Sequence, residues 1–135
     1  MVTIVDTNLW IDFTRPGSPS SLKKFIAPYV LDASNHLAEP IIFELLRLAN
    51  PIEYRQLTDQ FAIIPRLATP SDLWNKAAEL GQACRKKGHN LGALDLLIAS
   101  VALHHDATIV TFDEDFQRVS TVSKLLVKLL QRPTH

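Results

Sequence analysis

The stretch TIVDTNLWIDF, residues 3–13, joins a short apolar run to a second apolar segment through Asp6, Thr7 and Asn8. The β-branched run Val2–Val5 is typical of a buried strand, and Leu9–Phe13 predicts a short helix. An Asp between a strand and a helix often caps the helix. It can also belong to a site, because α/β sheets place their sites at the carboxyl ends of strands. The stretch therefore indicates an α/β unit and makes Asp6 a candidate functional residue.

The rest of the chain continues the alternation of strands and helices. Further strands are predicted in FAIIPRL (61–67) and ATIVTF (107–112), with a short one over Asn35–Ala38. Residues 120–131, STVSKLLVKLLQ, fit a strand, a helix or both. Two helices are predicted in LKKFIAPYV (22–30), capped by Ser20 or Ser21, and in IIFELLRLA (41–49), with Pro40 in its first turn. Two more run from Asn50-Pro51 to near Gln60 and from Thr69-Pro70-Ser71 to the stop at Gly88. The last is LGALDLLIASVALHH (91–105), capped by Asn90. This order predicts an α/β domain with a mainly parallel sheet.

Length and composition predict one domain over residues 1–135. Of the 135 residues, 47% are hydrophobic and 21% are charged, which is ordinary for a globular protein with a core. No window approaches eighteen consecutive apolar residues, and the N-terminus lacks the features of a secretory signal. Cys84 is the only cysteine, so no internal disulfide can form. These features predict a protein without a membrane span in the reducing cytoplasm.

The charge balance restricts how the chain can contact nucleic acid. Its 14 basic and 14 acidic residues give a net charge of zero, which argues against a protein that coats nucleic acid non-specifically. Any such contact must be local. The segment Arg85–Asn90, RKKGHN, is the best candidate, although a solvated helix end favoured by the helix dipole is the simpler explanation.

Two carboxylates lie inside apolar helices. Glu44 is surrounded by the apolar residues of IIFELLRLA, a composition typical of a buried helix. A Glu44–Arg47 pair is the structural alternative, but it would supply only a few tenths of a kcal/mol. If Asn90 caps the next such helix, Asp95 lies in its second turn and is buried or half-buried. If Asp95 is itself the cap, the helix is shorter.

Two more carboxylates, Asp113 and Asp115, follow the strand that ends at Thr111 and Phe112. Turn chemistry alone can explain acidic residues at this point. Several carboxylates in one pocket, however, raise each other's pKa unless a cation is present. All-oxygen ligands favour Mg²⁺ or Mn²⁺ over zinc. Mg²⁺ also recruits phosphate oxygens, so convergence of these acids would indicate phosphodiester or phosphoryl chemistry.

Four motifs, IVDTNLWIDF, IIFELLRLA, KKGHNLGALDLLIASVAL and ATIVTFDEDF, occur in the order and approximate spacing of PIN-domain proteins. The resemblance covers nearly the whole chain and is strongest to VapC-type toxin ribonucleases. It implies a three-layer α/β/α sandwich around a mainly parallel sheet. The segment LDASNHLAEP (31–40) departs from the strand that usually precedes the second motif.

The resemblance also implies the site residues. The acidic quartet would be Asp6, Glu44, Asp95 and Asp113, acting as metal ligands and catalytic residues. Asn8 would position Asp6 or a metal-bound water, and Thr111 would be the hydroxyl beside the fourth acid. Asp115 also fits the fourth position. Asp113 is preferred because it follows Thr111 by two residues, which leaves Asp115-Phe116 as a trailing pair with Phe116 packed inward.

The implied function is a Mg²⁺- or Mn²⁺-dependent endoribonuclease acting as the toxin of a toxin–antitoxin system. Its partners would be an RNA substrate and a small antitoxin of the VapB kind, and a homodimer is expected. Leu45, Leu48, Tyr54 and Leu57 are candidates for the antitoxin groove, or are simply core residues. The alternatives are a catalytically silent PIN-like module that binds RNA or a partner, a haloacid-dehalogenase-type aspartyl-phosphate phosphatase, and a receiver-like domain. The last two would want a second acid near Asp6, where the chain has Asn8.

Overall fold

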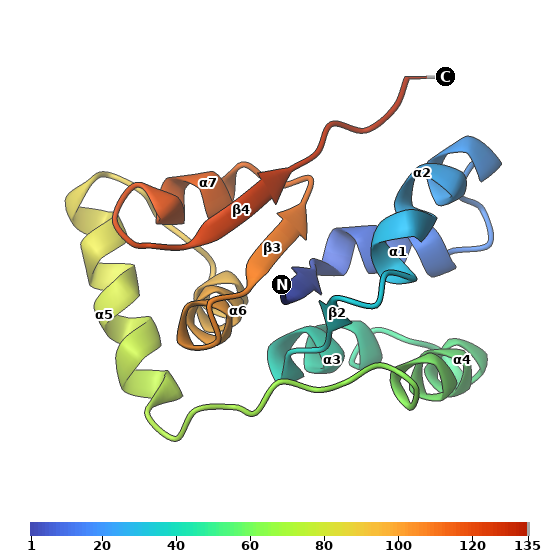
Figure 1. The fold of residues 1–135 in the computed structure, drawn as a ribbon, viewed down its shortest axis with the longest axis horizontal. Coiled ribbons are helices and arrows are strands. Elements are labelled where there is room, and N and C mark those ends of the chain that lie inside the picture. Colours follow the sequence, from blue (N-terminus) through green and yellow to red (C-terminus); the bar gives the residue numbers. More distant parts are fainter. Residues whose placement is uncertain (135) are drawn as a thin grey trace.

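A four-stranded sheet forms the centre of the protein. The structure is a computed structural model that describes residues 1–134. Its strands are β1 (Thr3–Val5), β2 (Asn35–His36), β3 (Thr108–Thr111) and β4 (Leu126–Leu129), in the order β2-β1-β3-β4 (Figure 1). All three pairings are parallel, with Val5 opposite Val110 in the central pair. The predicted α/β class with a parallel sheet is confirmed.

The seven helices found in the described residues flank this sheet. They are α1 (Thr7–Thr14), α2 (Ser20–Val30), α3 (Glu39–Leu46), α4 (Pro51–Phe61), α5 (Leu73–Lys86), α6 (Ala93–His104) and α7 (Asp115–Ser120). Helix α6 contacts α3, α5 and β3, and α1 contacts both α2 and α3 (Figure 1). The core between them includes Ile4, Leu9, Trp10, Ile98 and Ile109, each at most 1% exposed. Within residues 1–134, no helix has the length and apolar character needed to cross a membrane.

Local sequence signals place several helix ends as predicted. Asn50 and Glu53 form a reciprocal capping box at the start of α4, where Pro51 occupies the first turn. Gly88 follows the end of α5 with φ of 83°, a left-handed conformation that glycine adopts without steric cost. Both ends depend on contacts within a few residues.

Three predicted boundaries are wrong. Helix α2 is preceded by Pro19 as its N-cap, not by Ser20 or Ser21, and helix α5 begins at Leu73 after a turn. Helix α6 is preceded by Gly92 rather than Asn90. Asp95 therefore lies in the first turn of α6, not the second, and is neither deep in the helix nor its cap.

The predicted strand at residues 61–67 is also wrong. Phe61 is buried as the last residue of α4, and only an isolated bridge joins Arg66 to Leu37. Pro65 lies beside that bridge and has no N–H to donate to a ladder. The segment makes two backbone hydrogen bonds with Leu37, directly after β2, and then leaves the sheet.

Helix α3 is not buried all round, contrary to its apolar sequence. Ile41 is fully buried, whereas Phe43 is 59% exposed. The helix packs against α1 and α6, which leaves its remaining side open. Glu44 is half-buried at the border between these sides.

Candidate acidic site

Asp6 lies where β1 ends and α1 begins, and it is only 3% exposed. Its Oδ1 accepts a hydrogen bond from the backbone N–H of Thr7 at 2.7 Å, which makes Asp6 the N-cap of α1. Its Oδ2 accepts a hydrogen bond from Thr111 Oγ1, also at 2.7 Å. Asp6 is therefore a helix cap and also part of a contact between the ends of β1 and β3.

Thr111 connects Asp6 to the acids that follow β3. Its hydroxyl donates to Asp6 and accepts a hydrogen bond from the backbone N–H of Asp113 at 2.9 Å. Asp113 Oδ1 in turn accepts a hydrogen bond from the backbone N–H of Asp115 at 2.9 Å. These bonds fix the turn from β3 into α7 and hold both acids beside the sheet edge.

Asp95 approaches this turn from the first turn of α6. Carboxylate oxygens of Asp95, Asp113 and Asp115 lie within 4.8 Å of one another, and all three residues are half-buried. One helix start and one strand end thus bring together three acids from two separate segments of the chain. Such a spacing of oxygen atoms suits a divalent cation that takes carboxylate ligands.

Asp6 and Glu44 lie outside that tight group but within its electrostatic field. The charge of Glu44 contributes to the raised pKa values of both Asp6 and Asp95. No ion pair joins Glu44 to Arg47 within residues 1–134, so the predicted structural alternative for Glu44 is not what the fold uses.

Burial raises the pKa of Asp6 from 3.8 to about 6. The hydrogen bonds from Thr111 and from the Thr7 N–H oppose this change, while the charges of Glu44 and Asp113 add to it. The pKa of Asp95 rises to about 7, first through burial and then through the charges of the four other acids. The site therefore holds negative charge together at a free-energy cost, which a bound cation would relieve.

The remaining predicted residues also lie at this sheet edge. Asn8 is half-buried in the first turn of α1, two residues after Asp6. Phe116 is fully buried, as predicted for the residue after Asp115.

Arg118 was not predicted: it pairs with Asp115 and lies 3.9 Å from Glu114. Its spacing of three residues from Asp115 on a helix was the available signal.

The chain is thus an α/β protein with a cluster of acids at the carboxyl ends of its central strands. The PIN domain family model matches residues 3–122, and the chain belongs to that family. In sequence it is similar to Ribonuclease VapC21 of Mycobacterium tuberculosis, with 33% identity over 67 residues. That alignment covers 48% of this chain, and the chain spans about half the length of the relative, 49%.

Solved structures agree with this assignment at the level of the fold. The chain is similar to VapBC2 from Rickettsia felis bound to a promoter DNA fragment, with a TM-score of 0.70 and 20% identity, covering 97% of this chain and all, 100%, of that one. It is similar to VapBC-1 from nontypeable Haemophilus influenzae, with a TM-score of 0.69 and 19% identity over 96% and 98% of the chains. It is also similar to DNA-bound VapBC from Salmonella typhimurium, with a TM-score of 0.70 and 16% identity, covering 95% of this chain and 98% of that one.

Proposed function

We propose that this protein is a Mg²⁺- or Mn²⁺-dependent endoribonuclease and the toxin of a toxin–antitoxin pair, acting in the cytoplasm. The main support is the close approach of Asp95, Asp113 and Asp115 beside the buried Asp6 in a PIN-family fold. The similarity to a VapC ribonuclease suggests the substrate class, and the VapBC titles of the structural neighbours suggest the antitoxin partner.

The donor set fits a hard divalent cation. The clustered ligand atoms are all carboxylate oxygens, and the pKa values of two site acids are raised, partly by neighbouring negative charges. Asp95 and Asp113 would hold the cation with Asp6 and Glu44 completing the acidic wall, and Asp115 is the alternative to Asp113. When bound, such a cation lowers the pKa of a coordinated water and stabilises charge on the phosphate.

The residues of the chain itself prepare this site. Thr111 fixes the carboxylate of Asp6, because it donates to Oδ2 while the Thr7 N–H binds Oδ1. The same hydroxyl fixes the backbone of Asp113. Asp95 enters from the first turn of α6, so a second element supplies a carboxylate beside Asp113 and Asp115 for the cation. Asn8 adds an amide beside Asp6.

A groove beside the acids is the proposed antitoxin contact. A cavity of about 130 Å³ lies between α1, α3 and α4, and Glu44 and Leu48 contribute to its wall. Leu48, in the turn after α3, is 68% exposed and Tyr54 on α4 is 49% exposed, whereas Leu45 and Leu57 are buried. An antitoxin segment bound here would reach the acidic site through Glu44. A homodimer is proposed from the family resemblance.

The decisive experiment replaces Asp6 with Asn. Asn keeps a side-chain oxygen that can cap α1, so the fold should persist, as checked by circular dichroism. Cleavage of single-stranded RNA in Mg²⁺ should fall by orders of magnitude, because Asn removes the charge at the site. Asp59→Asn, at an exposed acid of α4, is the matched control and should cleave like wild type. A folded Asp6→Asn variant with wild-type cleavage would limit Asp6 to helix capping.

A further inference from the structure

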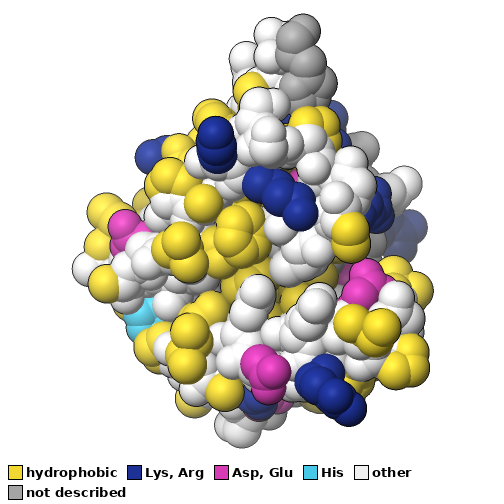
Figure 2. Space-filling view, turned by 90° about the vertical axis from the view of Figure 1, so that its right-hand side faces the viewer, with side chains coloured by type: hydrophobic (Ala, Val, Ile, Leu, Met, Phe, Trp, Pro, Cys, Tyr) yellow, Lys and Arg dark blue, Asp and Glu magenta, His cyan; other side chains and the backbone are white. Residues whose placement is uncertain are grey.

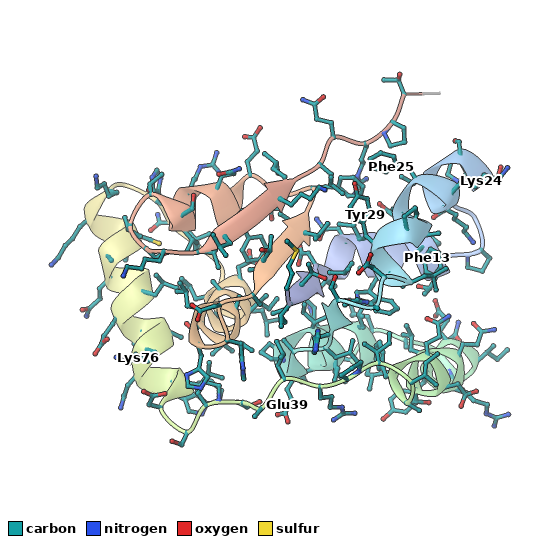
Figure 3. All side chains as sticks on the ribbon, in the orientation of Figure 1. Phe13, Lys24, Phe25, Tyr29, Glu39 and Lys76 are labelled. Carbon is teal, nitrogen blue, oxygen red and sulfur yellow. The ribbon has the colours of Figure 1, made fainter. Side chains whose placement is uncertain are left out.

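Three aromatic rings from two distant segments form a row beside the acidic site. Phe25 and Tyr29 lie one helical turn apart on α2, with ring centroids 6.3 Å apart. Phe112, directly after β3, stacks with Phe25 at 6.3 Å and an interplanar angle of 17°. Figure 3 shows Phe25 and Tyr29 pointing from α2 toward the chain that follows β4. We call these three side chains the aromatic row.

Two cations from the C-terminal part of the chain lie over this row. Lys128 Nζ is 5.2 Å from the centre of the Tyr29 ring, and Arg132 Cζ is 4.9 Å from the centre of the Phe112 ring. An ion pair of 3.0 Å with the buried Asp12 also positions Arg132. Both cations are exposed, and Figure 2 shows Lys and Arg side chains among hydrophobic ones in the upper half of this end of the molecule.

The aromatic row is continuous with the acidic site. Phe112 lies between Thr111, which hydrogen-bonds to Asp6, and Asp113, which belongs to the acidic cluster. All three rings are half-buried, so each keeps part of its surface accessible. A ligand that contacts Phe112 is therefore already at the edge of the acids.

We propose that the aromatic row, with Lys128 and Arg132, binds the bases and phosphates of single-stranded RNA that enters the acidic site. The inference rests on the proposed function and specifies how its substrate is held. Bases stack on aromatic side chains regardless of sequence. Lys128 and Arg132 lie over the faces of Tyr29 and Phe112, so these exposed cations would move from the rings to the phosphates when bases stack there. The chain has no net charge and its site is acidic, so local cations are needed to hold a polyanion there.

The charge distribution favours RNA over a protein partner at this surface. The cations over the rings match the phosphates of a nucleic acid. The groove between α1, α3 and α4 instead carries two acids, Glu44 and Glu53, against one cation, Arg15, so its net negative charge would repel phosphate. The groove reaches the site through Glu44 and the aromatic row reaches it through Phe112, and the two surfaces suit different ligands.

The test measures binding of a labelled single-stranded RNA by fluorescence anisotropy in EDTA, across a range of salt concentrations. Phe25→Leu and Phe112→Leu keep apolar volume but lose the stacking surface, and each should raise Kd by about tenfold. Lys128→Gln and Arg132→Gln should each reduce the slope of log Kd against log salt by about 0.7. RNA duplex should not respond to the ring variants, because its bases are already stacked.

Matched controls lie at the opposite end of the molecule, on α5. Trp74 is an aromatic residue that is 73% exposed there, and Lys76 is an exposed cation (Figure 3). Trp74→Leu and Lys76→Gln should change neither the Kd nor the salt slope. Lys128→Gln keeps the test valid if a ring variant fails to fold, since Lys128 is exposed.

The outcomes separate this inference from the proposed function. A wild-type protein that cleaves RNA, with Kd and salt slope unchanged in the variants, would overturn the inference alone. The inference would also be overturned if the α5 control variants weakened RNA binding as much as the ring and cation variants do. The same holds if the weaker binding of those variants were fully explained by a lower melting temperature. A wild-type protein that neither binds nor cleaves RNA would overturn both.

Discussion

Replacing Asp95 with Asn should stabilise the cation-free protein at neutral and alkaline pH. Asp95 is half-buried, and burial first and then the charges of four other acids raise its pKa to about 7. Asn has nearly the same shape and carries no charge. The substitution therefore removes repulsion and desolvation from the folded state while leaving the packing of α6 in place.

The size of the effect follows from the pKa. The difference between 3.8 and about 7 corresponds to about 4 kcal/mol at most. Because Asp95 is partly exposed, solvent screening reduces this to about 1–2 kcal/mol. Asn also loses the favourable interaction of a negative charge with the start of α6, about 0.5 kcal/mol. A net gain of about 1 kcal/mol should raise the melting temperature by about 3–5 °C.

The pH dependence of this gain identifies its cause. A carboxyl whose pKa is raised in the folded state stabilises the fold fully below its unfolded value, 3.8, and loses that contribution as pH rises to about 7. Wild type should therefore lose stability over this range relative to Asp95→Asn. The difference between the two should be small near pH 4, grow through pH 7 and level off above it.

The assay is urea or thermal unfolding in EDTA at several pH values between about 4 and 8.5, the range set by linkage. Asp59→Asn, an exposed acid far along α4, should show no such growth. Added Mn²⁺ should raise the melting temperature of wild type more than that of Asp95→Asn, because only ligands of the folded state stabilise it. An Asp95→Asn variant that is less stable than wild type at every pH would refute the reasoning and make Asp95 a structural residue.

Two further substitutions test the supports of the site. Thr111→Val should destabilise the protein by about 2 kcal/mol and reduce RNA cleavage, because buried Asp6 and the Asp113 N–H each lose a hydrogen-bond partner. Thr111→Ser keeps the hydroxyl and should restore stability and cleavage, as measured by chemical unfolding and by cleavage rates. Gly88→Ala should cost about 1 kcal/mol through its φ of 83° and leave the cleavage rate per folded molecule unchanged, as measured by unfolding and by active-fraction-corrected rates.

The sequence was sufficient where a feature depends on neighbouring residues. The β-branched runs formed β1 and β3, and Asn50 with Glu53 capped α4. The position of Asp6 also followed from local order, since a strand that leads into a helix places its last residue at the sheet edge. Its hydrogen bond to Thr111 spans 105 residues and was not predicted, since the family resemblance had placed Thr111 beside the fourth acid.

Other features depended on competition that the sequence does not resolve. Asn90 and Gly92 both suit the start of α6, and the choice of Gly92 moved Asp95 from the second turn to the first. An acid in a first turn points its charge toward the exposed N–H groups of the helix, where it is favoured by the dipole. The aromatic row was missed because its rings come from separate segments that only tertiary packing brings together.

The acidic site shows how the fold balances stability against a functional charge cluster. Asp6 keeps two short hydrogen bonds that offset part of its burial, so its pKa reaches only about 6. No hydrogen bond contributes to the pKa shift of Asp95, and its pKa rises further, to about 7. The more strongly anchored acid is thus suited to orienting the site, and the less satisfied one to binding a cation. Because repulsion destabilises the cation-free fold, each ligand that neutralises these acids must also stabilise the folded state.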